Sequence, residues 1–190
     1  MNIFLKNMQG KVELRKADTL YELNGKVGDL TKYSDDAIVG AGTMFDTSLH
    51  ALHRDGDGKV RGAYHLGSGL VTTAGVNLLA ADWTNTTATL KLANFIDSGT
   101  GATTAGTGDT GLQLPTGNAR VAGAQTNPVA GQYRTAATLT YGATFAITEF
   151  GLFTATTAGT MWDHKVFAAI NVVAGDSVAF SYVLTCNAGG

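Results

Sequence analysis

The stretch that decides the fold runs from Thr138 to Asn187 and contains three apolar segments: LTYGATFAITEFGLFTA, MWDHKVFAAINVVAG and DSVAFSYVLTCN. In each one, apolar side chains alternate with polar or small ones. Two sets share a strand face: Val166, Ala168, Ile170 and Val172, and then Val178, Phe180, Tyr182 and Leu184. A period of two over this length predicts half-buried strands of an antiparallel sheet. The short corner Ala174-Gly175-Asp176 predicts that the last two strands pair as a hairpin.

The alternation contains one break. Phe145 and Ile147 are separated by an even number of positions, but Phe150 and Leu152 fall on the opposite parity. Since a shift of one residue turns every later side chain to the other face of the sheet, this break predicts a β-bulge near Thr148–Glu149. A strand buried on both faces, as at a sandwich interface, is the alternative.

The middle of the chain mixes helical and strand signals. Val71, Gly75, Leu78 and Leu79 recur near helical spacing, and the adjacent Thr72-Thr73 pair can cap a short helix. Strand–loop–strand is the competing interpretation, because Val and Thr favour β structure. Residues 98–119 are rich in Gly and Thr and predict a long loop, and loops of that length are usually functional or flexible.

The charges divide the chain in two. Nine of the 13 Lys and Arg residues and nine of the 15 Asp and Glu residues fall within residues 1–62. We therefore predict an N-terminal arm over residues 1–62, with an extra hairpin of the main domain as the alternative. Residues 63–190 predict six to eight short strands with Gly-rich turns. That pattern is typical of an all-β fold, an antiparallel β-sandwich or jelly-roll-like domain.

Composition argues against several classes of partner. A net charge of -2 and a pI near 6.0 give no reason to expect nucleic acid. The most apolar window, near residues 69–81, is broken by polar residues and is too short to span a membrane. The single cysteine, Cys186, leaves no internal disulfide.

Three apparent site motifs have simpler interpretations. Asp55-Gly56-Asp57-Gly58 lacks the later ligands of a calcium loop and predicts a turn between strands. The glycines of residues 106–111 match a dinucleotide fingerprint, but Pro115 follows where a helix would have to begin. His50 and His53 could share a helical face, yet no further metal ligand follows at a recognised spacing. We predict no metal and no cofactor.

Glu149 is the one charge inside the most apolar segment. A buried carboxylate needs a partner, and Arg120, Arg134 and Lys165 are the candidates in this half of the chain. A catalytic acid of a glycan hydrolase would need a second carboxylate beside it, and the sequence indicates none. We predict no catalytic residue and no enzymatic activity.

Four segments of the second half resemble a group of bacteriophage virion proteins. They are GTGATTAGTGDTGL (Gly99–Leu112), AITEFGLFTA (Ala146–Ala155), GTMWDHKVF (Gly159–Phe167) and GDSVAFSYVLT (Gly175–Thr185). The resemblance covers about half of the chain and implies a structural part of a virion. Its motifs are structural, so it transfers no functional residue.

The resemblance leads us to expect a head decoration or cement protein, located in the virion, that binds the major capsid protein and itself, as a homotrimer. A tail fibre, tail-tip or baseplate component is the alternative. The apolar residues of the arm are the expected contacts, with Trp162 as a further one. The expected interface residues are Phe4, Leu5, Leu14, Leu20, Tyr21, Leu23 and Trp162.

Overall fold

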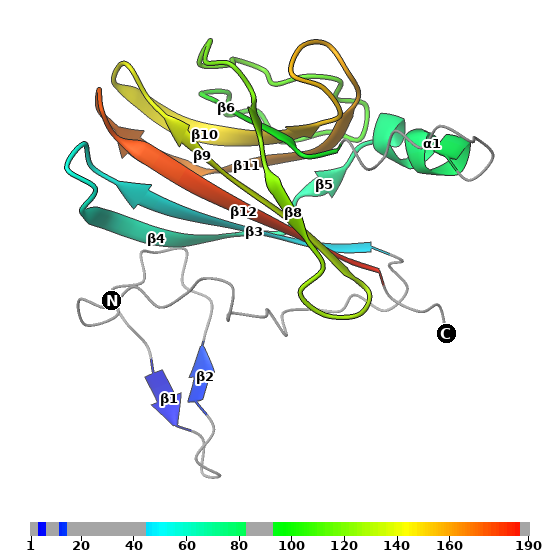
Figure 1. Ribbon diagram of the computed structural model, residues 1–190, viewed down its shortest axis with the longest axis horizontal. Coiled ribbons are helices and arrows are strands. Elements are labelled where there is room, and N and C mark those ends of the chain that lie inside the picture. Colours follow the sequence, from blue (N-terminus) through cyan, green and yellow to red (C-terminus); the bar gives the residue numbers. More distant parts are fainter. Residues whose placement is uncertain (1–3, 7–11, 15–44, 83–92, 187–190) are drawn as a thin grey trace.

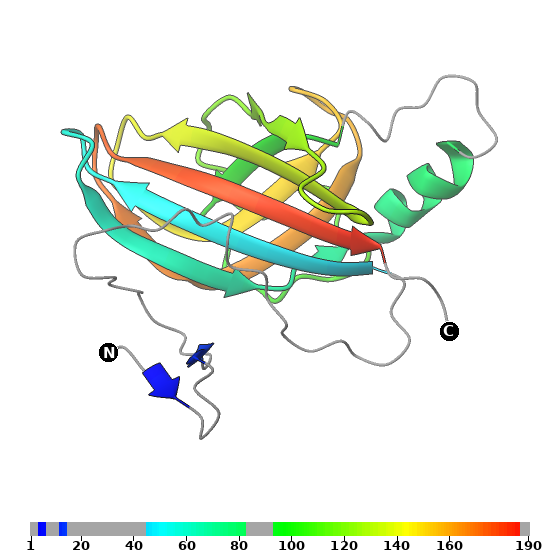
Figure 2. The same ribbon diagram turned by 60° about the horizontal axis from the view of Figure 1, so that its bottom comes forward.

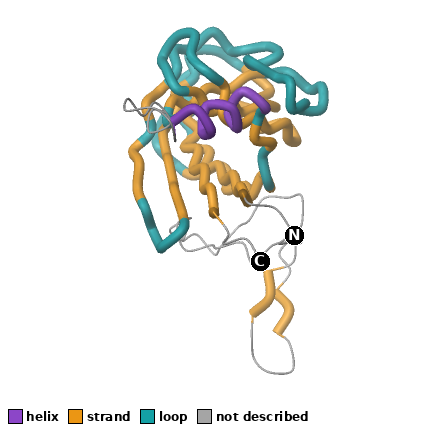
Figure 3. The backbone as a smooth tube through the Cα atoms, turned by 90° about the vertical axis from the view of Figure 1, so that its right-hand side faces the viewer, coloured by secondary structure: helices purple, strands orange, loops and turns teal. Residues whose placement is uncertain are grey.

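The computed structural model describes residues 4–6, 12–14, 45–82 and 93–186. Two five-stranded sheets pack face to face (Figures 1 and 2), and every pair of neighbouring strands is antiparallel. A helix, α1 (Thr73–Asp82), lies at one end of the sandwich (Figure 3). The predicted all-β antiparallel sandwich is confirmed.

The two sheets draw their strands from distant parts of the chain. The first has the order β4 (Val60–Gly67), β3 (Phe45–Arg54), β12 (Ser177–Cys186), β9 (Gln132–Thr140) and β8 (Ala124–Thr126). The second has the order β5 (Leu70–Val71), β11 (Met161–Val172), β10 (Phe145–Phe153), β6 (Phe95–Gly99) and β7 (Val121–Ala122). A separate antiparallel pair consists of β1 (Phe4–Lys6) and β2 (Val12–Leu14).

The predicted boundary after residue 62 is wrong, because the sandwich begins at Phe45. β3 lies between β4 and β12 and pairs with β12 along its full length, from Phe45 opposite Cys186 to Arg54 opposite Ser177. Its inward side chains include Leu49 and Ala51, which are fully buried. The charges near residues 54–61 belong to the turn between β3 and β4 and its edges, so they mark a solvated corner rather than an arm.

The last two strands do not form the predicted hairpin. β11 pairs with β10 and β5, whereas β12 pairs with β3 and β9, so the corner between them crosses from one sheet to the other. Gly175 takes a φ of 93° there, a left-handed conformation that suits glycine. Asp176 holds the corner, since its carboxylate accepts the Val173 N–H at 3.1 Å and contacts His53 Nε2 at 2.8 Å. Alternation shows which face is buried but not which sheet a strand joins.

The predicted bulge is confirmed. Along β10 and β11 the register moves from Ile147 opposite Ile170 to Glu149 opposite Val166. Ile147 and Phe150 both enter the core, and Glu149 turns to the opposite face of the sheet. On β11 the same irregularity lies between Val166 and Ile170, two residues that the alternation had assigned to one strand face.

Aromatic side chains from both sheets fill the core. Phe150 of β10 stacks on Tyr182 of β12 at a centroid distance of 6.1 Å and meets Phe180 at 5.5 Å. All three are essentially inaccessible to solvent. Burying a side chain of this size contributes roughly 1.5–3 kcal/mol, so this layer is a main source of cohesion between the sheets.

The predicted helix after Val71 is also confirmed, which removes the strand–loop–strand alternative. Thr72 caps it, because its Oγ1 accepts the Gly75 N–H at 3.0 Å. Gly75 packs against Trp162 so closely that a Cβ there would lie 2.8 Å from the Trp162 carbonyl oxygen. This contact joins the first turn of α1 to β11.

Candidate functional site

A cluster of buried polar side chains lies under the Gly/Thr loop, on the outer face of β10 and β11. The loop begins after Gly99 at the end of β6, and its two ends lie side by side. The Thr100 N–H donates to the Leu114 carbonyl at 2.8 Å, and Gly99 pairs with Pro115. Between these points the chain folds over the sheet. The exposed residues of this segment are Ala102, Thr103, Thr104, Thr107, Gly108, Thr110 and Leu114.

Glu149 anchors both ends of this loop. Its side chain is fully buried, and its Oε1 accepts the N–H groups of Gly101 at 2.9 Å and Leu114 at 2.8 Å. Its Oε2 accepts the Gln113 N–H at 2.9 Å. The β-bulge is what aims this carboxylate outward at the loop. One side chain therefore satisfies three backbone donors that the irregular loop would otherwise bury unpaired.

His164 links the same carboxylate to the middle of the loop. Its Nε2 lies 3.1 Å from Glu149 Oε2, and its Nδ1 lies 2.7 Å from Asp109 Oδ2. Asp109 also accepts the Gly106 N–H at 2.8 Å, which closes the turn that carries it. We call Glu149, His164 and Asp109 the loop clasp. Each ring nitrogen of His164 faces one carboxylate oxygen, so the imidazole ring bridges Glu149 and Asp109.

The surroundings favour the ionised form of both carboxylates. Burial alone would raise the pKa of Glu149, but the N–H groups of Leu114, Gln113 and Gly101, together with His164, outweigh it and hold that pKa below its ordinary value. The Gly106 N–H has the largest effect on Asp109 and lowers its pKa; burial raises that pKa by less, and His164 lowers it further. Each carboxylate is thus stabilised by the loop that it holds.

This arrangement suits architecture better than catalysis. Both nitrogens of His164 already face carboxylates, so neither is left to take a proton from a substrate. The two carboxylates stand on opposite sides of one imidazole ring and do not converge on an open point. In the described part of the chain, no group of three His, Cys, Asp or Glu side chains is placed to hold a metal ion.

We expect acid to weaken the clasp. Because the folded-state pKa values of Glu149 and Asp109 lie below the ordinary values of 4.5 and 3.8, their contribution to stability is complete above those values. It is lost as the pH falls through the lowered values. Urea unfolding measured from about pH 5 to about pH 2 should show a steep fall in the free energy of unfolding. The Glu149→Gln variant should show a shallower fall, and equal slopes would contradict this assignment.

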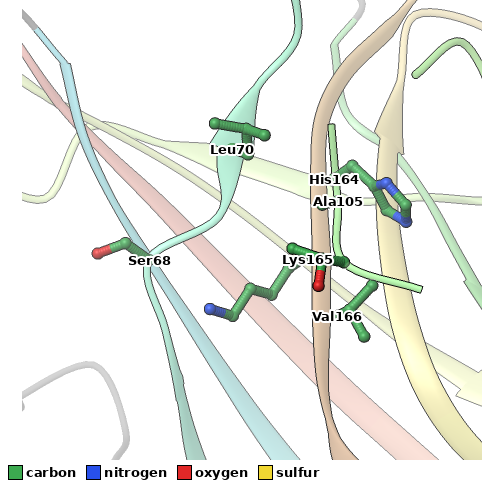
Figure 4. Close-up of a pocket in the computed structure, with 7 residues that line it drawn as sticks. Ser68, Leu70, Ala105, His164, Lys165 and Val166 are labelled. Atoms are coloured by element: carbon green, nitrogen blue, oxygen red, sulfur yellow. The ribbon is translucent and has the colours of Figure 1, made fainter. Parts of the chain in front are cut away.

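A small recess of about 270 Å³ lies beside the clasp, at the edge of β11. Its lining comes from the β4–β5 connection, the loop and β11: Ser68, Leu70, Thr104, Ala105, His164, Lys165 and Val166. His164 and Lys165 leave β11 in opposite directions (Figure 4), so the His164 ring enters the clasp and the Lys165 side chain runs toward the β4–β5 connection. The recess therefore borders two different polar regions.

Three of the predicted interface residues lie in the β1–β2 pair. Phe4 and Leu5 lie in β1 and Leu14 in β2, where Phe4 is opposite Leu14. Three others, Leu20, Tyr21 and Leu23, lie outside the described residues.

Trp162 is only 2 % exposed, and its Nε1 donates to the Tyr182 hydroxyl at 3.0 Å. It is a core residue, so the prediction that it contacts a partner is wrong.

The histidine and glutamate interpretations also change. His50 and His53 lie on β3, three positions apart, so they point to opposite faces and share no helical face. The buried Glu149 was expected to pair with Arg120, Arg134 or Lys165. Its partner is His164, whereas Arg120 is 3.5 Å from Asp97.

Sequence analysis did not predict Asp109 as a member of the site. It lies 55 residues from His164 in the chain, inside a loop without regular spacing. The available signal was that Asp109, in the GDT triplet, is the one charged residue of the Gly/Thr loop over residues 98–119.

No protein family, curated protein or solved structure matches this chain.

Proposed function

We propose that the protein is a structural component of a bacteriophage virion and that it decorates the outside of the capsid. The observation that supports this proposal is that three of the segments that resemble phage virion proteins meet in the loop clasp. They are the loop Gly99–Leu112, the strand with Glu149 and the strand with His164. What these segments share is therefore a way of holding a loop on a sheet. That is a task for a scaffold rather than for a catalyst.

A stiff sandwich that carries a fixed loop suits repeated binding to a symmetric lattice. Such interfaces bury a modest area in each copy, and repetition multiplies a modest affinity. In this proposal the major capsid protein is the partner, and the chain also associates with itself as a homotrimer. Residues ahead of Phe45, including β1 and β2, supply the contacts to the capsid.

The described residues are compatible with this role. No helix within them combines the length and apolar character needed to cross a bilayer. The exposed large apolar side chains are scattered over separate elements: Val76, Leu114, Val129 and Val173. The sandwich itself presents no broad apolar patch through these residues.

Binding to particles tests the proposal directly. Particles that lack the protein should bind the purified full-length chain in a co-sedimentation experiment, and a chain that lacks residues 1–44 should stay in the supernatant. Light scattering of the full-length chain should give the mass of three copies. A truncated chain that binds as well as the full-length one would contradict the role assigned to the residues ahead of Phe45.

A tail component is the second candidate, and one observation favours it. The loop exposes four threonines, Thr103, Thr104, Thr107 and Thr110, and the clasp holds its backbone on the sheet. A fixed polar loop suits contact with a receptor or a neighbouring tail protein. The number of copies in each particle distinguishes this candidate from a capsid coat.

A further inference from the structure

A buried acid lies in the core, away from the clasp. Asp163 on β11 is fully buried and faces inward, opposite Leu152 on β10. Its Oδ2 accepts a hydrogen bond from the Tyr182 hydroxyl at 3.2 Å, and its Oδ1 has no hydrogen-bond partner among the described residues. An ionised carboxylate in such a place is poorly compensated, because only one of its oxygens is paired.

The wall beside this carboxylate is the connection Gly67–Ser68–Gly69 between β4 and β5. A Cβ on Gly69 would lie 1.9 Å from Asp163 Oδ1, so only glycine allows the backbone to pass there. Gly67 has a φ of 80°, and a Cβ on it would lie 3.6 Å from Lys165 Nζ. The recess of about 270 Å³ lies against the same connection, since Ser68 and Leu70 line it (Figure 4). A glycine-rich strip, Gly67–Ser68–Gly69, thus packs against both Asp163 and Lys165 and borders the recess.

The groups that face Asp163 come from each element packed on it. They are Tyr182 of β12, Lys165 of β11 and the Leu70 amide of β5. The Glu149 carboxylate and His164 lie on the other face of the sheet. Burial raises the pKa of Asp163 to about 7, against the smaller lowering effects of Tyr182, the Leu70 amide and Lys165.

The same connection leads directly into α1. Leu70 and Val71 pair with His164 and Asp163, and Thr72 N–H then donates to the Trp162 carbonyl at 2.9 Å. The next residue, Thr73, donates its N–H to the Thr107 carbonyl of the loop at 2.8 Å. Any loosening of the strip would therefore reach β5, the N-terminal turn of α1 and the tip of the loop.

We propose that Asp163 is a proton-operated switch on the β4–β5 connection. Its neutral form leaves Gly67–Ser68–Gly69 closed over the core, and its ionised form opens that strip toward the recess. Opening lets water reach Oδ1 and brings the carboxylate nearer to the Lys165 ammonium. β5 and the start of α1 loosen with it. The switch acts near neutral pH and does not depend on the proposed role in a virion.

Amide hydrogen exchange of the full-length chain at pH 6 and pH 8 tests this switch. After correction for the intrinsic effect of pH, residues 67–76 should exchange about tenfold faster at pH 8 than at pH 6, because the ionised fraction sets the open population. Amides of β12 should show no such change. Asp163→Asn, which cannot ionise, should remove the pH response. Asp57→Asn, which removes a carboxylate from an exposed turn, should keep it.

A second measurement covers the case in which Asp163→Asn fails to fold. The indole N–H of Trp162 donates to Tyr182, which donates to Asp163, so its NMR shift reports on this carboxyl. In the wild-type chain it should titrate with a midpoint near pH 7. The switch is overturned by an indole shift that stays constant from pH 6 to pH 8. It is also overturned by an exchange rate in residues 67–76 that ignores pH, or by a pH response that survives in a folded Asp163→Asn variant.

Discussion

A chain that lacks residues 1–62 will not fold, whereas a chain that lacks residues 1–44 will form the same sandwich. The first deletion removes β3, which pairs with β12 over ten positions and with β4 on its other side. It also removes the fully buried Leu49 and Ala51. Losing a central strand exposes an apolar face and leaves a row of backbone groups unpaired, a cost well above the roughly 5–15 kcal/mol that stabilises a typical domain.

Circular dichroism and the dispersion of amide NMR signals show whether each truncated chain folds. The chain starting at Phe45 should melt cooperatively with a strand-rich spectrum, and the chain starting at Ala63 should be insoluble or unfolded. A folded, cooperative chain from residue 63 onward would show that β3 is dispensable. That outcome would restore the boundary that the charge distribution suggested.

Glu149→Gln has the second largest expected effect, a loss of about 3–5 kcal/mol in the free energy of unfolding. The side chain keeps its size but replaces one acceptor oxygen by an amide group that donates. At Oε1 that group would face the N–H groups of Gly101 and Leu114, and at Oε2 it would face the Gln113 N–H and His164. Either orientation sets donor against donor inside a buried site, and the loop should detach from the sheet.

Urea unfolding and hydrogen exchange of residues 100–114 check this prediction. Thr148→Val is a control in the same place, because it removes one hydrogen bond, from Oγ1 to the Gly101 carbonyl at 2.7 Å, without touching the charge. It should cost about 1 kcal/mol. A Glu149→Gln variant no weaker than Thr148→Val would mean that the carboxylate does not hold the loop.

Local patterns in the sequence predicted the local features of the fold. The change of parity between Ile147 and Phe150 marked the bulge, because the side-chain period of a strand is a property of neighbouring residues. The Thr72-Thr73 pair marked the start of α1 for the same reason. The sheet membership of β11 and β12 depends instead on contacts with β10 and β3, which alternation does not encode.

The candidate site was predicted only in part. Glu149 stood out because it is a lone charge in an apolar segment, and its burial followed. Its partners did not, since the amides of Gly101, Gln113 and Leu114 become donors to it only when the loop is folded over the sheet. Every non-proline residue has a backbone N–H, so residue type does not show which amides will donate to a carboxylate. A search for side-chain cations therefore pointed to Arg120, which has its own partner in Asp97.

The number of copies in a purified particle tests the proposed role most directly. Quantitative mass spectrometry, with the major capsid protein as the internal standard, should find hundreds of copies in each particle, in a fixed ratio to the capsid subunits. Absence of the chain from particles, or a count of only a dozen or fewer, would contradict a capsid decoration protein.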